Sequence, residues 1–106
     1  MLFRRSRTIT PAEALERHGR GELVLVDVRE PDELRAGRIK GARNVPLGQL
    51  PARLGELDRD TAVAFVCQSG ARSAGATRVA ARAGYDAYNV RGGVLAWSRA
   101  GLPLTR

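Results

Sequence analysis

Cysteine and histidine are scarce in this chain, and their scarcity limits the chemistry open to it. The 106 residues include one cysteine, Cys67, which excludes an internal disulfide and any CxxC redox motif. Cys67 and the single histidine, His18, are too few ligands for a zinc site built by the chain alone. We therefore expect no metal and no cofactor.

Long apolar runs are also absent. None approaches the roughly 20 residues that a membrane-spanning helix needs, so we expect no membrane partner. Residues 1–7 are basic, but they are not followed by the apolar segment of a secretory signal. We expect a cytoplasmic protein in which residues 1–7 form a short basic extension.

Lysine is nearly missing, although the chain is strongly basic. Arginine supplies 17 of the 18 basic residues, and the formal net charge is +7. Such a charge suits nucleic acid or an anionic substrate. The arginines are spread along the chain rather than gathered in one block, which favours the simpler interpretation of a solvated, arginine-rich surface. We therefore do not expect nucleic acid as a partner.

The rest of the composition is that of one folded domain. Hydrophobic residues make up 43% of the chain, and its length suffices for a single core. No repeat, low-complexity tract or linker divides the sequence. We expect residues 1–106 to form a single domain.

Short apolar segments alternate with short helical patterns. Residues 23–28 and 62–66 are apolar almost throughout, as strands buried on both faces are. Two shorter strands are predicted over 42–45 and 87–90. The predicted helices span 11–19, 31–36, 47–57, 71–83 and 93–100. This alternation predicts an α/β fold with a mostly parallel sheet.

Two of these helices have specific sequence signals. Thr10 is the predicted N-cap of the first, with Pro11 in its first turn and Glu13 completing a capping box. Leucines at spacings of three, four and three residues run through 47–57 and lie on one helical face. That spacing predicts one continuous helix.

The segment after the second apolar strand carries the candidate nucleophile. Ligands bind beyond the carboxyl ends of parallel strands, and Cys67 stands at such an end. Gly70 allows the loop to curl so that backbone amides point inward, and the next helix adds its positive N-terminal end. Arg72 adds a cation. We expect the Cys67 pKa to be lowered and the thiolate to act as a nucleophile.

Cys67 and His18 each have a structural interpretation as well as a functional one. A lone cysteine is often only a small buried apolar residue, but Gly70, Arg72 and Ser73 directly after Cys67 favour a function. His18, near the end of the first helix, is better explained as a structural residue than as the partner of a Cys–His pair.

Four segments in order resemble the rhodanese-homology family, from about residue 9 to the end of the chain. They are DVR at 27–29, GRIKGARNVP at 37–46, CQSGARS at 67–73, and VRGGVLAW with AGLP at 90–97 and 100–103. The resemblance implies a central parallel sheet flanked by helices on both faces. Arg38 stands where the family usually has histidine, which we interpret as a structural change.

The resemblance also implies an activity, that of a thiosulfate sulfurtransferase. Cys67 would take sulfane sulfur from a donor such as thiosulfate as a persulfide and pass it to cyanide or a thiol. Arg72 would neutralise donor charge. The implied active-site loop consists of Cys67, Gln68, Ser69, Gly70, Ala71, Arg72 and Ser73.

Residues outside the loop are predicted to be structural. Asp27 and Arg29 would support the site, with Arg29 paired either to Asp27 or to Glu33. Trp97 fits the packing of the last helix. Gly92 and Gly93 fit a close approach of backbone segments.

Three alternatives within the same fold remain. Rhodanese-like phosphatases have one more residue between cysteine and arginine, whereas four separate Cys67 from Arg72 here. Non-catalytic binding modules commonly lack the cysteine. A sulfur-relay protein would pass its persulfide to a protein acceptor.

Overall fold

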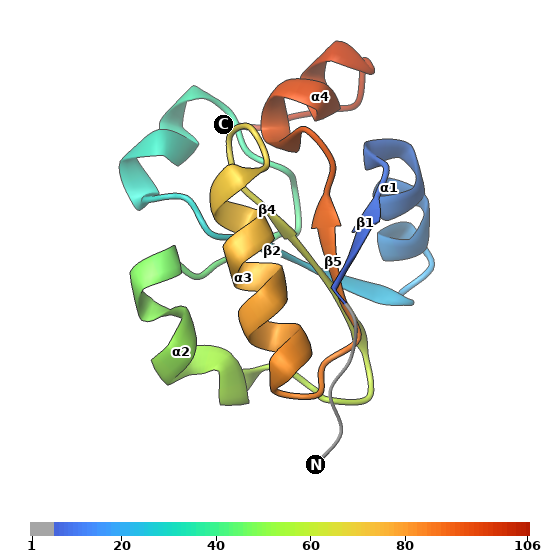
Figure 1. Ribbon diagram of the computed structural model, residues 1–106. Helices are drawn as coiled ribbons and strands as arrows, with labels where there is room; N and C mark the ends of the chain where they lie inside the picture. Colours follow the sequence, from blue (N-terminus) through green and yellow to red (C-terminus); the bar gives the residue numbers. More distant parts are fainter. Residues whose placement is uncertain (1–5) are drawn as a thin grey trace.

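The computed structural model describes residues 6–106 and contains one five-stranded sheet with the order β1-β5-β4-β2-β3 (Figure 1). All neighbouring strands are parallel. The strands are β1 (Arg7–Ile9), β2 (Leu23–Asp27), β3 (Arg43–Asn44), β4 (Ala62–Val66) and β5 (Ala87–Val90). The predicted α/β fold is therefore confirmed, with a sheet that is parallel throughout.

Helices cover both faces of this sheet, as expected. The α-helices are α1 (Pro11–Gly19), α2 (Leu50–Arg53), α3 (Ala71–Arg82) and α4 (Gly93–Arg99). Ala14 of α1 and Trp97 of α4 share one core cluster, and Leu50 of α2 and Ala80 of α3 share the other. Each helix therefore buries one side against a sheet that is apolar on both faces.

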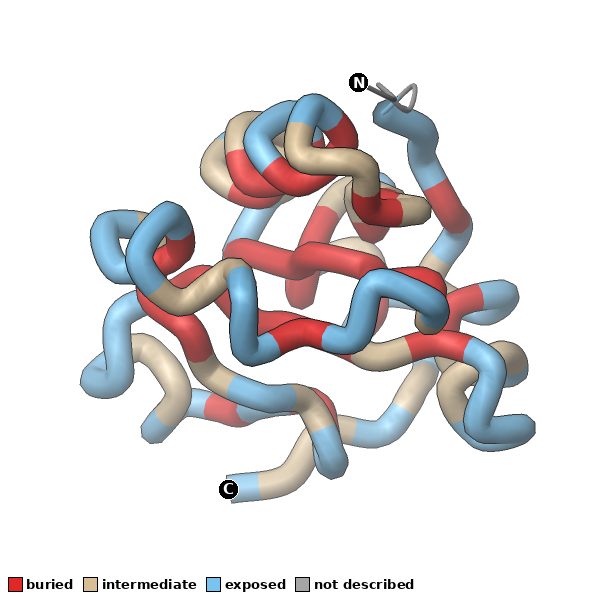
Figure 2. Tube along the Cα trace, turned by 90° about the horizontal axis from the view of Figure 1, so that it is seen from below, coloured by how far each residue is buried: buried red, intermediate tan, exposed pale blue. Residues whose placement is uncertain are grey.

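The two core clusters meet at the central strands. All five residues of β4 are buried, and Phe65 packs on the α2–α3 face while its neighbours in the strand pack on the α1–α4 face. Buried residues gather along the middle of the molecule in Figure 2. The apolar runs of the sequence thus become strands with no solvent-facing side.

The single helix predicted over 47–57 is wrong. The segment forms a 3-10 turn (Leu47–Gln49), α2, and a second 3-10 turn (Leu54–Glu56). Pro51 lies in the first turn of α2, where its missing N–H is tolerated; inside a longer helix it would break the ladder. Proline therefore overrides the leucine periodicity.

The helix predicted over 31–36 is a 3-10 helix, η1 (Pro31–Ala36). Thr10 caps α1 as predicted, because its Oγ1 accepts from the Glu13 amide at 3.2 Å. At η1 a glutamate folds back on the chain: the Glu33 carboxylate accepts from the Glu30 amide at 2.9 Å. Glu33 is thereby held at the carboxyl end of the sheet.

The N-terminal boundary differs from the expectation. Arg7, assigned to a basic extension over 1–7, is the first residue of β1 and pairs with Tyr88 of β5. Residues 1–5 of that predicted extension lie outside the described residues. The strand predicted over 42–45 is shorter, and those over 62–66 and 87–90 are confirmed.

Residues 6–106 contain neither a helix that could span a membrane nor a cluster of metal-ligating side chains. Over that range no helix combines the length and the apolar character needed to cross a bilayer. In the same range, no three histidine, cysteine, aspartate or glutamate side chains gather where they could hold a metal ion.

Candidate active site

Cys67 lies directly beyond the carboxyl end of β4 and is 1% exposed. The loop that follows turns at Gly70, whose φ of 107° is a left-handed conformation that favours glycine. A Cβ on Gly70 would also lie 3.3 Å from the backbone nitrogen of Gly92. The turn therefore brings the loop back over the sulfur and starts α3 next to it.

Hydrogen bonds converge on the Cys67 sulfur. The Gly70 amide lies 3.0 Å from Sγ, and the Ser73 hydroxyl lies 3.3 Å from it. Burial raises the pKa of the Cys67 thiol. Hydrogen bonds from the Ser73 side chain and from the amides of Ser73, Gly70 and Ser69 lower it, and together they outweigh the effect of burial. The net pKa is below the ordinary value, as predicted, which favours a nucleophilic thiolate.

The N-terminus of α4 is hydrogen-bonded to the backbone of the cysteine loop. The amides of Val94 and Leu95 donate to the carbonyl oxygens of Cys67 and Gln68 at 2.9 and 3.1 Å. A Cβ on Gly93 would collide with both oxygens. The close approach expected at the glycine pair is thus confirmed, and it allows the start of α4 to bind both carbonyls of the loop.

Arg72 does not bind the sulfur in this structure. Its two terminal nitrogens each donate at 2.8 Å to the Glu33 carboxylate of η1. This pairing raises the pKa of Arg72 and lowers that of Glu33 to about 2. The expected part of Arg72 in activating Cys67 stays a prediction: hydroxyl and amide donors lower the pKa of the thiol, and Arg72 interacts with Cys67 by charge rather than by a hydrogen bond.

Glu33 is a site residue that the sequence interpretation offered only as a partner for Arg29. Arg29 instead pairs with Asp27, through Nη2 to Oδ2 at 2.9 Å, and both side chains are almost fully buried. Arg29 also donates to the Gly37 carbonyl at 3.0 Å and to Gln68 Oε1 at 3.3 Å. The Asp27–Arg29 pair therefore ties η1 and the catalytic loop to the end of β2.

Asn89 was not found from the sequence. Its Nδ2 donates to the Gly70 carbonyl at 3.1 Å, and its Oδ1 lies 2.6 Å from the Ser73 hydroxyl. Asn89 belongs to no motif, and its only signal was its position in the predicted strand over 87–90.

The other candidate residues take surface or structural positions. Gln68, Ser69 and Ala71 are exposed at the loop. His18 Nδ1 lies 3.1 Å from the Leu23 carbonyl oxygen, so its described hydrogen bond is structural. Trp97 is fully buried and donates from Nε1 to the Pro103 carbonyl, as a core residue.

Arg38 holds the C-terminal segment with its backbone. It exchanges two hydrogen bonds of 2.8 Å with Thr105 in an antiparallel bridge. The Arg38 side chain is exposed. The bond uses main-chain atoms only, so it does not depend on which side chain stands at this position.

Comparison with known proteins identifies the family to which this chain is similar. The rhodanese-like domain family matches residues 10–100. A sulfurtransferase of Allochromatium vinosum is 40% identical over 84 residues, which are 78% of each chain. An HTH-type transcriptional regulator of Mycobacterium tuberculosis is 41% identical over 98 residues, which are 91% of this chain and 43% of the regulator.

Solved structures show the same fold. A rhodanese-related protein from Thermoplasma volcanium superposes with a TM-score of 0.87 and 33% identity, covering 93% of this chain and 97% of that protein. The family match, the parallel sheet and the cysteine loop at its carboxyl edge agree. The chain belongs to the rhodanese-like domain family.

Proposed function

We propose that this chain is a sulfurtransferase that carries sulfane sulfur as a persulfide on Cys67. The observation that supports the proposal most strongly is the set of donors on Sγ, the Gly70 amide at 3.0 Å and the Ser73 hydroxyl at 3.3 Å. Such donors stabilise the Cys67 thiolate, both when it attacks the donor and when it is released as the sulfur is passed on.

The first half-reaction loads the sulfur. With thiosulfate as donor, the Cys67 thiolate attacks the sulfane sulfur and forms a new S–S bond. The S–S bond within thiosulfate breaks, and sulfite leaves with the bonding electron pair. The enzyme now bears Cys67–S–S⁻, and no external oxidant or reductant is needed.

The second half-reaction unloads it. A nucleophilic acceptor attacks the terminal sulfur, and the Cys67 thiolate leaves with the electron pair of the broken bond. Cyanide becomes thiocyanate, and an acceptor thiolate becomes a persulfide. A low pKa of Cys67 favours this departure, because weaker bases leave faster.

Arg72 can assist the donor without leaving Glu33. A guanidinium has five N–H donors, and the pair with Glu33 uses one from each terminal nitrogen. The Arg72 side chain is 38% exposed, so its remaining donors are accessible to an anion. We assign Arg72 to orienting the sulfonate end of thiosulfate.

The loop length favours sulfur over phosphate. Four residues separate Cys67 from Arg72, and Gly70 already lies 3.0 Å from Sγ through its amide. A tetrahedral phosphoryl group on the sulfur would need a wider ring of donors. A protein acceptor of the persulfide remains a second candidate, since Gln68 and Ser69 are exposed at the loop.

The experiment that tests the proposal detects the intermediate directly. The protein is incubated with thiosulfate and, separately, with a small-molecule persulfide, and its intact mass is then measured. We expect one added sulfur atom, located on Cys67 and removed by cyanide. Cys67→Ser is the matched control, and it should gain no sulfur.

Kinetics give a second test. Because sulfur stays on the enzyme between donor and acceptor, double-reciprocal plots should be parallel, as in a ping-pong mechanism. An unmodified Cys67 after both donors, or activity retained in Cys67→Ser, would refute the proposal.

A further inference from the structure

One side chain contacts both groups that donate to the Cys67 sulfur. Asn89, on β5, donates from Nδ2 to the Gly70 carbonyl at 3.1 Å and places Oδ1 2.6 Å from the Ser73 hydroxyl. Gly70 and Ser73 in turn reach Sγ at 3.0 and 3.3 Å. Asn89 therefore contacts both residues that donate to the Cys67 sulfur, without contacting the sulfur itself.

The orientation of the Asn89 amide follows from its partners. A peptide carbonyl can only accept a hydrogen bond, so the amino group of Asn89 must face the Gly70 oxygen. Oδ1, which can only accept, then faces Ser73. While Cys67 is a thiol, the short Oγ–Oδ1 separation places the Ser73 hydrogen between the two oxygens.

Ser73 has one hydroxyl hydrogen and two acceptors within reach. When Cys67 is a thiol, its S–H can donate to Ser73 while Ser73 donates to Asn89. When Cys67 loses its proton to solvent, the thiolate also accepts, and it competes with Asn89 Oδ1 for that single hydrogen. A bond to sulfur leaves two oxygens facing each other without a hydrogen.

We propose that Asn89 is a positioning residue that controls the Cys67 proton through the Ser73 hydroxyl. Asn89 competes with the thiolate for the Ser73 hydrogen. The thiolate is therefore more basic than it would be if the Ser73 hydroxyl donated to sulfur alone. A more basic thiolate is a stronger nucleophile, since intrinsic nucleophilicity falls with pKa. The inference deepens the proposed function, because it concerns the same sulfur.

The other charged groups around the site remain in place when Asn89 or Ser73 is changed. They are Arg72 on α3, Glu33 on η1, and Asp27 with Arg29 at the end of β2. After β5, Arg91 is exposed and donates to Thr8. A pKa change on substitution of Asn89 thus reports hydrogen bonding rather than a lost charge.

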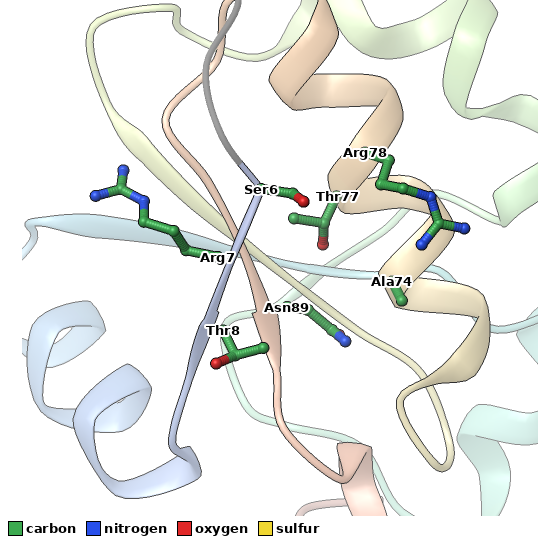
Figure 3. A pocket seen from close by; sticks show the side chains of 7 residues that line it. All are labelled: Ser6, Arg7, Thr8, Ala74, Thr77, Arg78 and Asn89. Carbon is green, nitrogen blue, oxygen red and sulfur yellow. The ribbon is translucent and has the colours of Figure 1, made fainter.

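Asn89 is half-buried and lies outside both core clusters. It lines a small open pocket of about 100 Å³ between β1, β5 and α3. Figure 3 shows its side chain reaching from β5 toward α3, with Thr8 of β1 nearby. Thr8 is its register partner in the sheet and lines the same pocket, but its described hydrogen bond is with Arg91.

The test is a double-mutant cycle on the Cys67 pKa, read from thiolate absorbance against pH. Cys67 is the only thiol, so the signal has one source. Asn89→Leu is made in the natural chain and in Ser73→Ala. The two arms of Asn89 act in opposite directions: loss of the Oδ1 acceptor lowers the pKa, and loss of the Gly70 contact raises it.

The cycle separates the two arms, because only the first needs the Ser73 hydroxyl. Asn89→Leu shifts the Cys67 pKa in each background. We expect that shift to be about half to one pKa unit more negative in the natural chain, which has the Ser73 hydroxyl, than in Ser73→Ala. Thr8→Val is the matched control and should leave the pKa unchanged. Circular dichroism verifies folding, and Asn89→Ala replaces Asn89→Leu if the latter is unfolded.

Equal shifts in the two backgrounds, or a less negative shift with the hydroxyl present, would overturn the inference. The titration needs no sulfur donor or acceptor. A failed sulfur-transfer assay and a failed cycle are therefore separate results.

Discussion

Arg72 and Glu33 form a two-bond ion pair, at 2.8 Å for each bond, that joins the first turn of α3 to η1 beside the Cys67 loop. The pair is partly exposed, with 38% of the Arg72 side chain and 31% of the Glu33 side chain accessible. The Arg72 guanidinium is therefore paired with the Glu33 carboxylate. An anionic sulfur donor that approaches Cys67 is attracted by the first group and repelled by the second.

This pairing predicts how charge affects donor use. Arg72→Ala should lower kcat/KM for thiosulfate about tenfold or more, because it removes a charge-assisted donor and leaves Glu33 to repel the anion. Adding Glu33→Gln should recover part of that loss. Steady-state kinetics measure both, with Arg99→Ala as a control of equal charge change. No recovery in the double variant would contradict the role of Glu33.

The same pair predicts a pH dependence of stability. The pKa of Glu33 is lowered from 4.5 to about 2, so its contribution is complete above 4.5 and is lost as the pH falls toward 2. Glu33→Gln should be less stable than the natural chain at neutral pH, by at most about 1 kcal/mol for a partly exposed pair. Urea unfolding at several pH values should show this difference vanishing in acid. A difference independent of pH would contradict the prediction.

The glycine pair predicts a large local effect on stability. Gly93 has a φ of 64°, and a Cβ there would collide with the Cys67 and Gln68 carbonyls. Gly93→Ala should destabilise the fold by about 1–3 kcal/mol or more and weaken sulfur transfer. Gly48→Ala is the control, since its Cβ meets nothing within 4 Å. Equal unfolding midpoints for the two variants would refute this account.

The loop length predicts a limit on substrates. The natural chain should transfer sulfur from thiosulfate and show negligible hydrolysis of aryl phosphates, because only four residues separate Cys67 from Arg72 and the Gly70 amide already lies 3.0 Å from Sγ. Inserting a glycine after Ser69 should weaken sulfur transfer by moving the Gly70 amide away from Sγ. Both activities are measured on both proteins. Faster phosphate hydrolysis than sulfur transfer by the natural chain would support the phosphatase alternative.

Much of the fold could be predicted because it is encoded locally. The strands predicted over 62–66 and 87–90 have those same bounds in the structure, and Thr10 and Pro11 start α1 where the capping signal placed it. The break at Pro51 was also encoded locally, but leucine periodicity was given more weight than the proline. β1 was missed because three residues are too few to show a pattern.

The sequence by itself determined that Cys67 follows a buried strand and that Gly70 turns the loop toward a helix start, since these residues are neighbours in the chain. Only the tertiary structure decided which polar groups meet the loop. Glu33 lies 39 residues from Arg72, and Asn89 lies 16 residues from Ser73. Strand order and register bring such side chains together, and no local periodicity records that order.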